Sequence, residues 1–117
     1  MAIPSGSGTE VLKRTSLHAV TNSFQAIITG TANHIYTILS VVACEQGETP
    51  ELFNMRVDVS ASGSNQIRLL EQQPIPAFGT FVFNDKIVLS GTDKLEVSTD
   101  GSANVDVYVS YIDQDWS

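Results

Sequence analysis

The side chains able to do chemistry are few in this sequence, and their spacing matches no known motif. Two histidines, His18 and His34, and one cysteine, Cys44, are the candidates for metal binding or nucleophilic catalysis. No HxH, HxxxH or CxxC spacing connects them, so a zinc site would need carboxylates from distant segments. A dyad of Cys44 with a histidine has no supporting local motif, because a thiol in an apolar segment ionises poorly.

Acidic residues gather toward the C-terminal end of the chain. Four aspartates follow Ser98, and no lysine or arginine lies among them. A calcium ion takes about six to eight oxygen ligands. Asp93, Asp100, Asp113 and Asp115 are the candidates for gathering around one, but no DxDxDG loop is present to hold it. Aspartates in turns more often accept hydrogen bonds from their own backbone. With no GxSxG, phosphate-loop or GxGxxG motif either, we predict no metal, no cofactor and no catalytic residues, and therefore a protein that is not an enzyme.

Charge and hydropathy limit the partners. The 117 residues carry a formal net charge of −7, which argues against binding nucleic acid, because that requires a basic surface. The longest apolar run, residues 35–44, is interrupted by Thr37 and Ser40 and is too short to span a bilayer. Residues 1–14 lack the basic and apolar regions of a secretory signal. We expect synthesis in a cytoplasm, no membrane partner, and a buried free thiol at Cys44.

The elements that must position these side chains are short strands. Apolar and polar residues alternate in segments about ten residues apart, with turn residues between them, and no helical period extends over a dozen residues. The expected strands are 10–14 continuing into 17–20, 24–29, 34–45, 52–59, 66–70, 80–83, 87–89, 94–97 and 105–112. This pattern predicts an all-β fold, an antiparallel β-sandwich of about eight strands, jelly-roll or immunoglobulin-like. Residues 9–117 form its single domain.

Three segments carry more detailed expectations. The 34–45 segment is apolar on both sides, which is typical of a central strand covered on both faces. In 52–59, Asn54, Arg56 and Asp58 alternate with apolar residues, so one face of this strand is expected to be wet. Two prolines make 72–77 an edge or a crossing segment. Among the aromatic residues, Tyr36, Phe78 and Phe81 are expected in the core.

Four residues are expected to contact other subunits. Ile3 and Pro4 belong to residues 1–8, a flexible N-terminal arm that is rich in glycine and serine. Tyr108 lies opposite Val107 and Val109 in its strand, and is therefore expected on the exposed face. Trp116 follows the last strand, where it either folds back over the end of the core or docks on a neighbouring subunit.

Three stretches of the chain carry a resemblance to known proteins. These are SGSGTEVLKR near the N-terminus, HIYTILSVVACE in the middle, and DKIVLSGTDKLEVSTDGSANVDVYVSYIDQDW at the C-terminal end. Together they resemble small virion structural proteins of tailed bacteriophages, especially those of marine and cyanobacterial hosts. The shared motif is a β-meander rather than a chemical signature, so the resemblance transfers no catalytic or ligand residues.

The resemblance implies a capsid decoration or cement protein, which binds the assembled phage head and stabilises it. It also implies a location in the virion, contact with the major capsid protein or other virion subunits, and a homo-oligomer, with a trimer favoured. One alternative is a tail, neck or adaptor component of the same virion. The other is a carbohydrate- or receptor-binding module on the particle surface.

Overall fold

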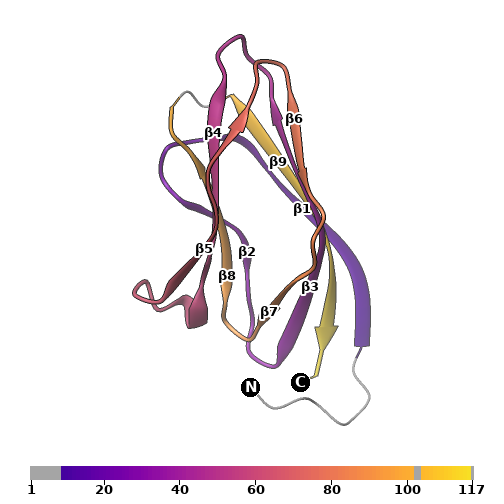
Figure 1. Ribbon diagram of the computed structural model, residues 1–117. Coiled ribbons are helices and arrows are strands. Elements are labelled where there is room, and N and C mark those ends of the chain that lie inside the picture. Colours follow the sequence, from indigo (N-terminus) through magenta and orange to yellow (C-terminus); the bar gives the residue numbers. More distant parts are fainter. Residues whose placement is uncertain (1–8, 102–103, 117) are drawn as a thin grey trace.

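Two antiparallel sheets packed face to face make up the structure, a computed structural model that describes residues 9–101 and 104–116 (Figure 1). The strands are β1 (Thr9–Val20), β2 (Gln25–Thr29), β3 (His34–Glu45), β4 (Glu51–Asp58), β5 (Gln66–Ile75), β6 (Thr80–Phe83), β7 (Ile87–Ser90), β8 (Lys94–Thr99) and β9 (Val105–Asp115). A single 3-10 turn, Val59–Ala61, follows β4. No helix within these described ranges is long and apolar enough to span a bilayer.

The strand order is that of a jelly roll. One sheet has the order β1-β9-β3-β6, with β7 also paired to β3, and the other has the order β2-β8-β4-β5. β6 pairs with residues 41–44 of β3, and β7 pairs with residues 35–38, so the two together act as one broken edge strand. The chain therefore changes sheets at every connection except β4 to β5 and β6 to β7. Of the two predicted sandwich types, this order is the double Greek key of the jelly roll.

The core lies between the sheets and follows the alternation of the sequence. In β9, Val105, Val107 and Val109 point inward and are at most 1% exposed. Phe53 and Met55 of β4 meet them from the other sheet and are fully buried. Because each strand gives every second side chain to the interior, burial of these residues is the main stabilisation of the sandwich.

β3 departs from the predicted alternation because it contains a bulge. Its pairing with β9 shifts register between Ile38 and Ser40, which inserts Leu39 as an extra residue. Tyr36 and Ile38 before the bulge, and Val41 after it, therefore all face the core. The expectation that β3 is covered on both faces was wrong, because its outward side chains are only partly buried.

Two further side chains differ from expectation. Phe78, expected in the core, lies in the connection between β5 and β6 and is 67% exposed. Cys44 is partly exposed rather than buried, because it points outward from β3. By contrast, Tyr36 is buried and Phe81 packs partly against the core, as predicted.

The residues after Leu70 confirm that a proline-rich segment does not enter a sheet centre. Pro74 lies in β5, opposite Leu52, and β5 is the last strand of its sheet. The missing N–H of proline is tolerated at such an edge. The predicted arm of residues 1–8, including Ile3 and Pro4, lies outside the described residues.

Candidate functional site

The most distinctive surface is the outward side of the five-stranded sheet, which we call the outer face. Side chains of neighbouring strands line up on it in rows, because residues paired across an antiparallel sheet point the same way. We call the end where β3 begins and β9 ends the lower end of the sandwich. The row nearer that end, the lower row, is Leu12, Ile112, Thr37 and Val88. The upper row is Ser16, Tyr108, Val42 and Val82. A polar row, Arg14, Ser110 and Ser40, runs between them.

Both rows expose large apolar side chains. Leu12 is 72% exposed, Val88 62%, Val82 51% and Tyr108 41%. These are four of the seven large apolar side chains that are exposed in the described part of the chain. Large apolar side chains gathered on one exposed face mark interaction sites in soluble proteins.

Two hollows lie on either side of Tyr108. The lower hollow, of about 420 Å³, is bordered by Leu12, Leu39 and Tyr108. The upper one, of about 250 Å³, lies between β1, β3 and β9 and is bordered by Val42 and Tyr108. Arg14 lies beside this aromatic ring, with its guanidinium carbon 6.0 Å from the ring centre. Tyr108 is therefore a ridge between two shallow, mainly apolar depressions.

Local structure fixes the position of these side chains. The uninterrupted alternation of β9 places Tyr108 outward between two buried valines. The bulge in β3 turns Leu39 toward the lower hollow. At the upper end, Asp106 accepts a hydrogen bond from the backbone N–H of Ala19 at 2.9 Å and lies 2.7 Å from His18. These contacts hold the end of β1 against β9.

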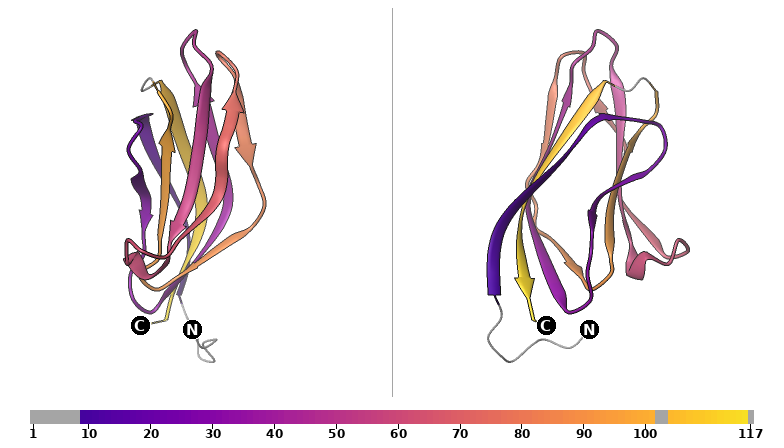
Figure 2. Two further views of the ribbon diagram at one scale, coloured as in Figure 1. Left: turned by 60° about the vertical axis from the view of Figure 1, so that its left-hand side comes forward. Right: turned by 180° about the vertical axis from the view of Figure 1, so that it is seen from behind.

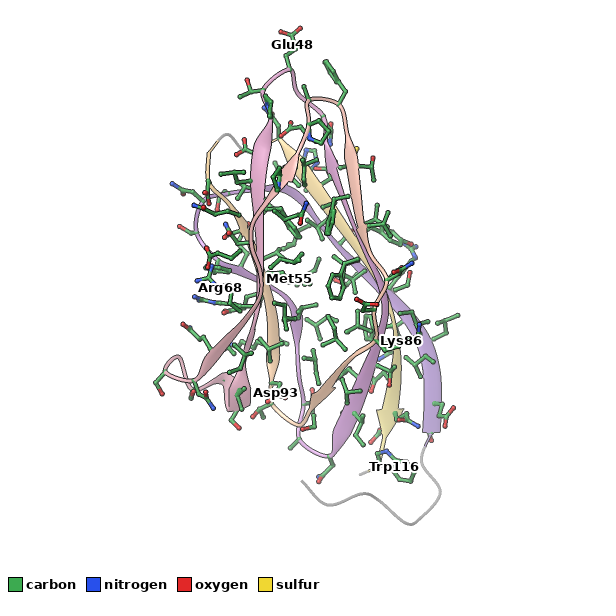
Figure 3. All side chains as sticks on the ribbon, in the orientation of Figure 1. Glu48, Met55, Arg68, Lys86, Asp93 and Trp116 are labelled. Atoms are coloured by element: carbon green, nitrogen blue, oxygen red, sulfur yellow. The ribbon has the colours of Figure 1, made fainter. Side chains whose placement is uncertain are left out.

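The outward side of the four-stranded sheet is different, because charged groups cover it. Arg56 pairs with Glu96 at 2.8 Å, and both side chains are mostly buried. The guanidinium carbons of Arg56 and Arg68 lie 3.7 and 4.8 Å from the centre of the Phe24 ring. Figure 3 shows Arg68 projecting from this side of the molecule. The expectation of a simple wet face for β4 was wrong, since Asp58 is only 4% exposed.

Asn54 is also buried on this side, at 4% exposure. Its amide nitrogen donates a hydrogen bond to Asp100 at 2.9 Å, and its amide oxygen accepts one from the backbone N–H of Gln72 at 2.8 Å. Gln72 has a φ of 53° at an irregularity in β5. Asn54 therefore satisfies a backbone group that the regular ladder does not pair.

One cluster of titratable residues lies at the lower end of the sandwich. His34 Nδ1 lies 2.7 Å from Asp113, and the Lys13 ammonium donates a hydrogen bond to the same carboxylate at 2.9 Å. The ring of His34 stacks on Tyr36, which in turn lies against Tyr111. We call these five residues the polar plug. Of the five, Tyr36 and Asp113 are buried.

Burial and hydrogen bonding oppose each other in the plug. Burial alone raises the pKa of Asp113, but hydrogen bonds from Lys13 and His34 outweigh it and hold that pKa below its ordinary value. The hydrogen bond to Asp113 raises the pKa of Lys13. Burial raises the pKa of Tyr111. The carboxylate of Asp113 and the ammonium of Lys13 are thus mutually stabilised in their charged forms.

This arrangement favours structure over catalysis. The second ring nitrogen of His34 lies 3.5 Å from Asp115, so carboxylates flank both nitrogens. Neither hollow of the outer face borders on His34. Asp93, one of the four calcium candidates, accepts hydrogen bonds from the backbone N–H groups of Ser60 and Ser90. No group of three metal-ligating side chains occurs within residues 9–101 and 104–116.

The structure separates the predicted interface residues. Tyr108 lies at the centre of the outer face, whereas Trp116 lies at the lower end, beyond β9 (Figure 3). The backbone N–H of Trp116 donates to Asn33, and its side chain is partly buried. Sequence reasoning missed Leu12, Val82 and Val88. Each is an apolar residue at a position that alternation assigns to the outward side of its strand, so a signal was present.

No family model and no curated protein matches this sequence. The likeness to tailed-phage virion proteins that the C-terminal motif indicates therefore stays a prediction.

Solved structures do match the fold. A protein of the T13 IBDV viral particle has a TM-score of 0.56 at 8% identity, covering 99% of this chain and 35% of that one. A protein of Bacillus endospore appendages, which form disulfide-linked pili, has a TM-score of 0.52 at 14% identity, covering 100% and 97%. A pentameric capsid protein from metagenomic phage sequences has a TM-score of 0.48 at 10% identity, covering 89% of this chain; this chain spans 61% of its length. The likeness establishes the fold, an all-β sandwich used in viral particles and in a pilus.

Proposed function

We propose that this protein is a virion structural protein that binds to the assembled phage head and stabilises it, as a capsid decoration protein. The observation that carries the proposal is the apolar outer face, where Leu12, Val82, Val88 and Tyr108 are exposed on a regular sheet. A face of this kind gains free energy by burial against another protein surface.

Two further observations support a role in assembly. The ionisable groups of the lower end are engaged with one another in the polar plug, and the hollows of the outer face are shallow and mainly apolar. The sandwich fold also matches that of the T13 IBDV particle protein. We assign the contact with the shell to the β6 and β7 edge, where Val82 and Val88 both project outward from the broken edge strand, opposite Val42 and Thr37 of β3.

The test is a binding experiment with particles assembled without the protein. Purified protein is mixed with these particles, and the bound fraction is measured by sedimentation together with the heat tolerance of the particles. Wild-type protein is expected to bind in many copies and to raise the temperature at which the heads open. The V82D/V88D variant is expected to lose binding, because it places two charges in an interface that excludes water.

The matched control is Gln66→Asp, which adds a charge at an exposed position of β5 in the other sheet. It should bind like the wild type. Absence of wild-type binding, with no change in heat tolerance, would refute a decoration role. A few copies at one vertex or on the tail would instead indicate the tail or neck position.

The Bacillus appendage protein favours a second candidate, a filament subunit. That comparison covers nearly the whole of both chains, whereas this chain covers 35% of the IBDV protein. Electron microscopy of the purified protein at high concentration distinguishes the two functions. Regular filaments in the absence of any particle would favour the filament subunit over the decoration protein.

A further inference from the structure

We propose that the apolar head of the N-terminal arm, residues 1–4, docks in the lower hollow of the outer face of a second copy of this chain. The inference goes beyond attachment to a shell and assigns a different part of the outer face. The edge with Val82 and Val88 remains the proposed contact with the shell. The part of the outer face on β1 and β9 is the proposed contact between copies of this chain. The partner is therefore another copy of the same protein.

The sequence of the arm has two parts. Residues 1–4, MAIP, are all apolar, and residues 5–8, SGSG, have the composition of a linker. Transfer of an apolar tetrapeptide from water to an apolar surface within its reach is favourable.

The lower hollow suits such a peptide. Its lining combines three residues with large apolar or aromatic side chains and three polar or charged residues: Leu12, Leu39 and Tyr108, with Lys13, Arg14 and Ser110. Its volume of about 420 Å³ is many times the roughly 30 Å³ share of a water molecule. In the proposed contact, the apolar side chains of residues 1–4 occupy the hollow, and its polar residues form hydrogen bonds with the backbone of the extended arm.

The first half of β1 gives a second, independent reason. Residues 9–14 are all exposed, although they are paired with β9. Val11 is 45% exposed on one face of this strand and Leu12 is 72% exposed on the other. β1 is also the last strand of its sheet, so its outer edge has unpaired backbone groups. Figure 2 shows this edge in indigo beside β9.

Chain length favours a second copy over the same molecule. The arm leaves at Thr9, and Leu12 lies about 10 Å further along the same strand. If the arm folded back on its own sheet, residues 5–8 would be needed to form the turn that reverses the chain direction. Ile3 would then reach only the Leu12 end of the hollow. A neighbouring arm has no such reversal to make and extends up to about 27 Å.

Each copy then donates one arm and receives another. Two copies can exchange arms reciprocally in a two-fold dimer, or each copy can pass its arm to the next in a head-to-tail contact. Head-to-tail contacts close into a ring or continue into a filament. A ring of three copies is the closed form that the phage resemblance implies.

Charge variants test the exchange by complementation. Ile3→Asp disables the donor, and Leu12→Asp disables the acceptor at a position too exposed to threaten folding. Sedimentation velocity should show an oligomer for the wild type and a monomer for each variant, with self-association weakened about 100-fold or more. A 1:1 mixture of the two variants should form a dimer, because one intact arm still meets one intact hollow.

Ser7→Asp is the matched control, since it adds the same charge to the arm outside the apolar head. It should keep the wild-type oligomer. A monomeric wild type, an oligomer that survives Ile3→Asp, or a mixture that stays monomeric would each overturn the proposal. If a monomeric wild type still bound to particles, only the arm exchange would be refuted and the decoration role would stand. If the protein formed an arm-dependent oligomer that did not bind to particles, only the decoration role would be refuted.

Discussion

The two outward surfaces of the sandwich have opposite characters. Across the four-stranded sheet, Glu96, Arg56 and Arg68 form one continuous charged row, and Asp58 and Lys94 belong to the next. Across the five-stranded sheet, the corresponding rows are mainly aliphatic and aromatic. Both surfaces come from strands with similar alternation toward the core, so the difference lies entirely in the residues that alternation points outward.

From this difference we expect the charged surface to contribute to folding and the apolar surface to association. The charged surface satisfies its groups within the chain, through the Arg56–Glu96 pair and the contact with Phe24. The apolar surface leaves Leu12, Val82 and Val88 more than half exposed. Substitutions on the charged side should therefore affect the free energy of unfolding, and substitutions on the outer face should affect association.

Among substitutions on the two outward surfaces, Arg56→Met should give the largest loss of stability. The substitution keeps an unbranched side chain but leaves Glu96, which is 13% exposed, without its cation. We expect a decrease in the free energy of unfolding of roughly 2–4 kcal/mol, because a mostly buried carboxylate loses its partner. Urea denaturation measures it.

Arg68→Met is the control for this prediction. Its partner Glu71 is 61% exposed, and exposed pairs contribute at most about 1 kcal/mol. If both variants lost the same stability, the charged surface would not depend on the buried pair. Neither variant should change association through the outer face.

Lys13→Met should have an intermediate effect that depends on pH. The pKa of Asp113 is below its ordinary value of 3.8 in the folded protein. Its contribution to stability is therefore present above pH 3.8 and is lost as the pH falls through the folded pKa. Removing Lys13 takes away the main favourable interaction, so the acid unfolding midpoint should move to higher pH. At neutral pH we expect a loss of about 1 kcal/mol, because a hydrogen bond to a charged group is removed while His34 remains.

An acid titration followed by circular dichroism measures this shift. Lys86→Met removes the same charge at an exposed turn and should leave the midpoint in place. An unchanged midpoint in the Lys13 variant would show that the polar plug does not depend on this ion pair.

Leu12→Ser should have the smallest effect on stability. The side chain is 72% exposed, so the free energy of unfolding should change by no more than about 0.5 kcal/mol. Leu95→Ser, at a fully buried position, should cost roughly 3–5 kcal/mol. Thermal unfolding compares the two variants, and a large loss in the Leu12 variant would mean that the outer face already packs within the monomer.

Most of the fold could be predicted from the sequence, because strand alternation and turn residues are local signals. The segments 34–45 and 80–83 were predicted with the bounds they have, and β9 was predicted with its correct faces. The bulge at Leu39 could not be predicted, since an inserted residue is defined only by its partner strand. The same holds for Asn54, whose burial depends on the irregular backbone of β5.

The candidate surface was predicted only in part. Tyr108 stood out because it interrupts a run of valines, whereas Leu12 and Val88 resembled ordinary strand residues. Whether an outward side chain is covered depends on what packs over its sheet, and that is a property of the whole fold. The polar plug was also missed, since Lys13, His34 and Asp113 are far apart in the sequence and meet only through the pairing of β1, β3 and β9.

Thr9 lies opposite Asp115, so β1 begins where β9 ends. The connection between β3 and β4, with Glu48 at its tip, lies at the opposite pole (Figure 3). The two ends of the sandwich are therefore structurally distinct. A peptide grafted beside Glu48 would be displayed at the far pole, away from the arm, while a cargo fused after β9 would be held close to the assembly contacts.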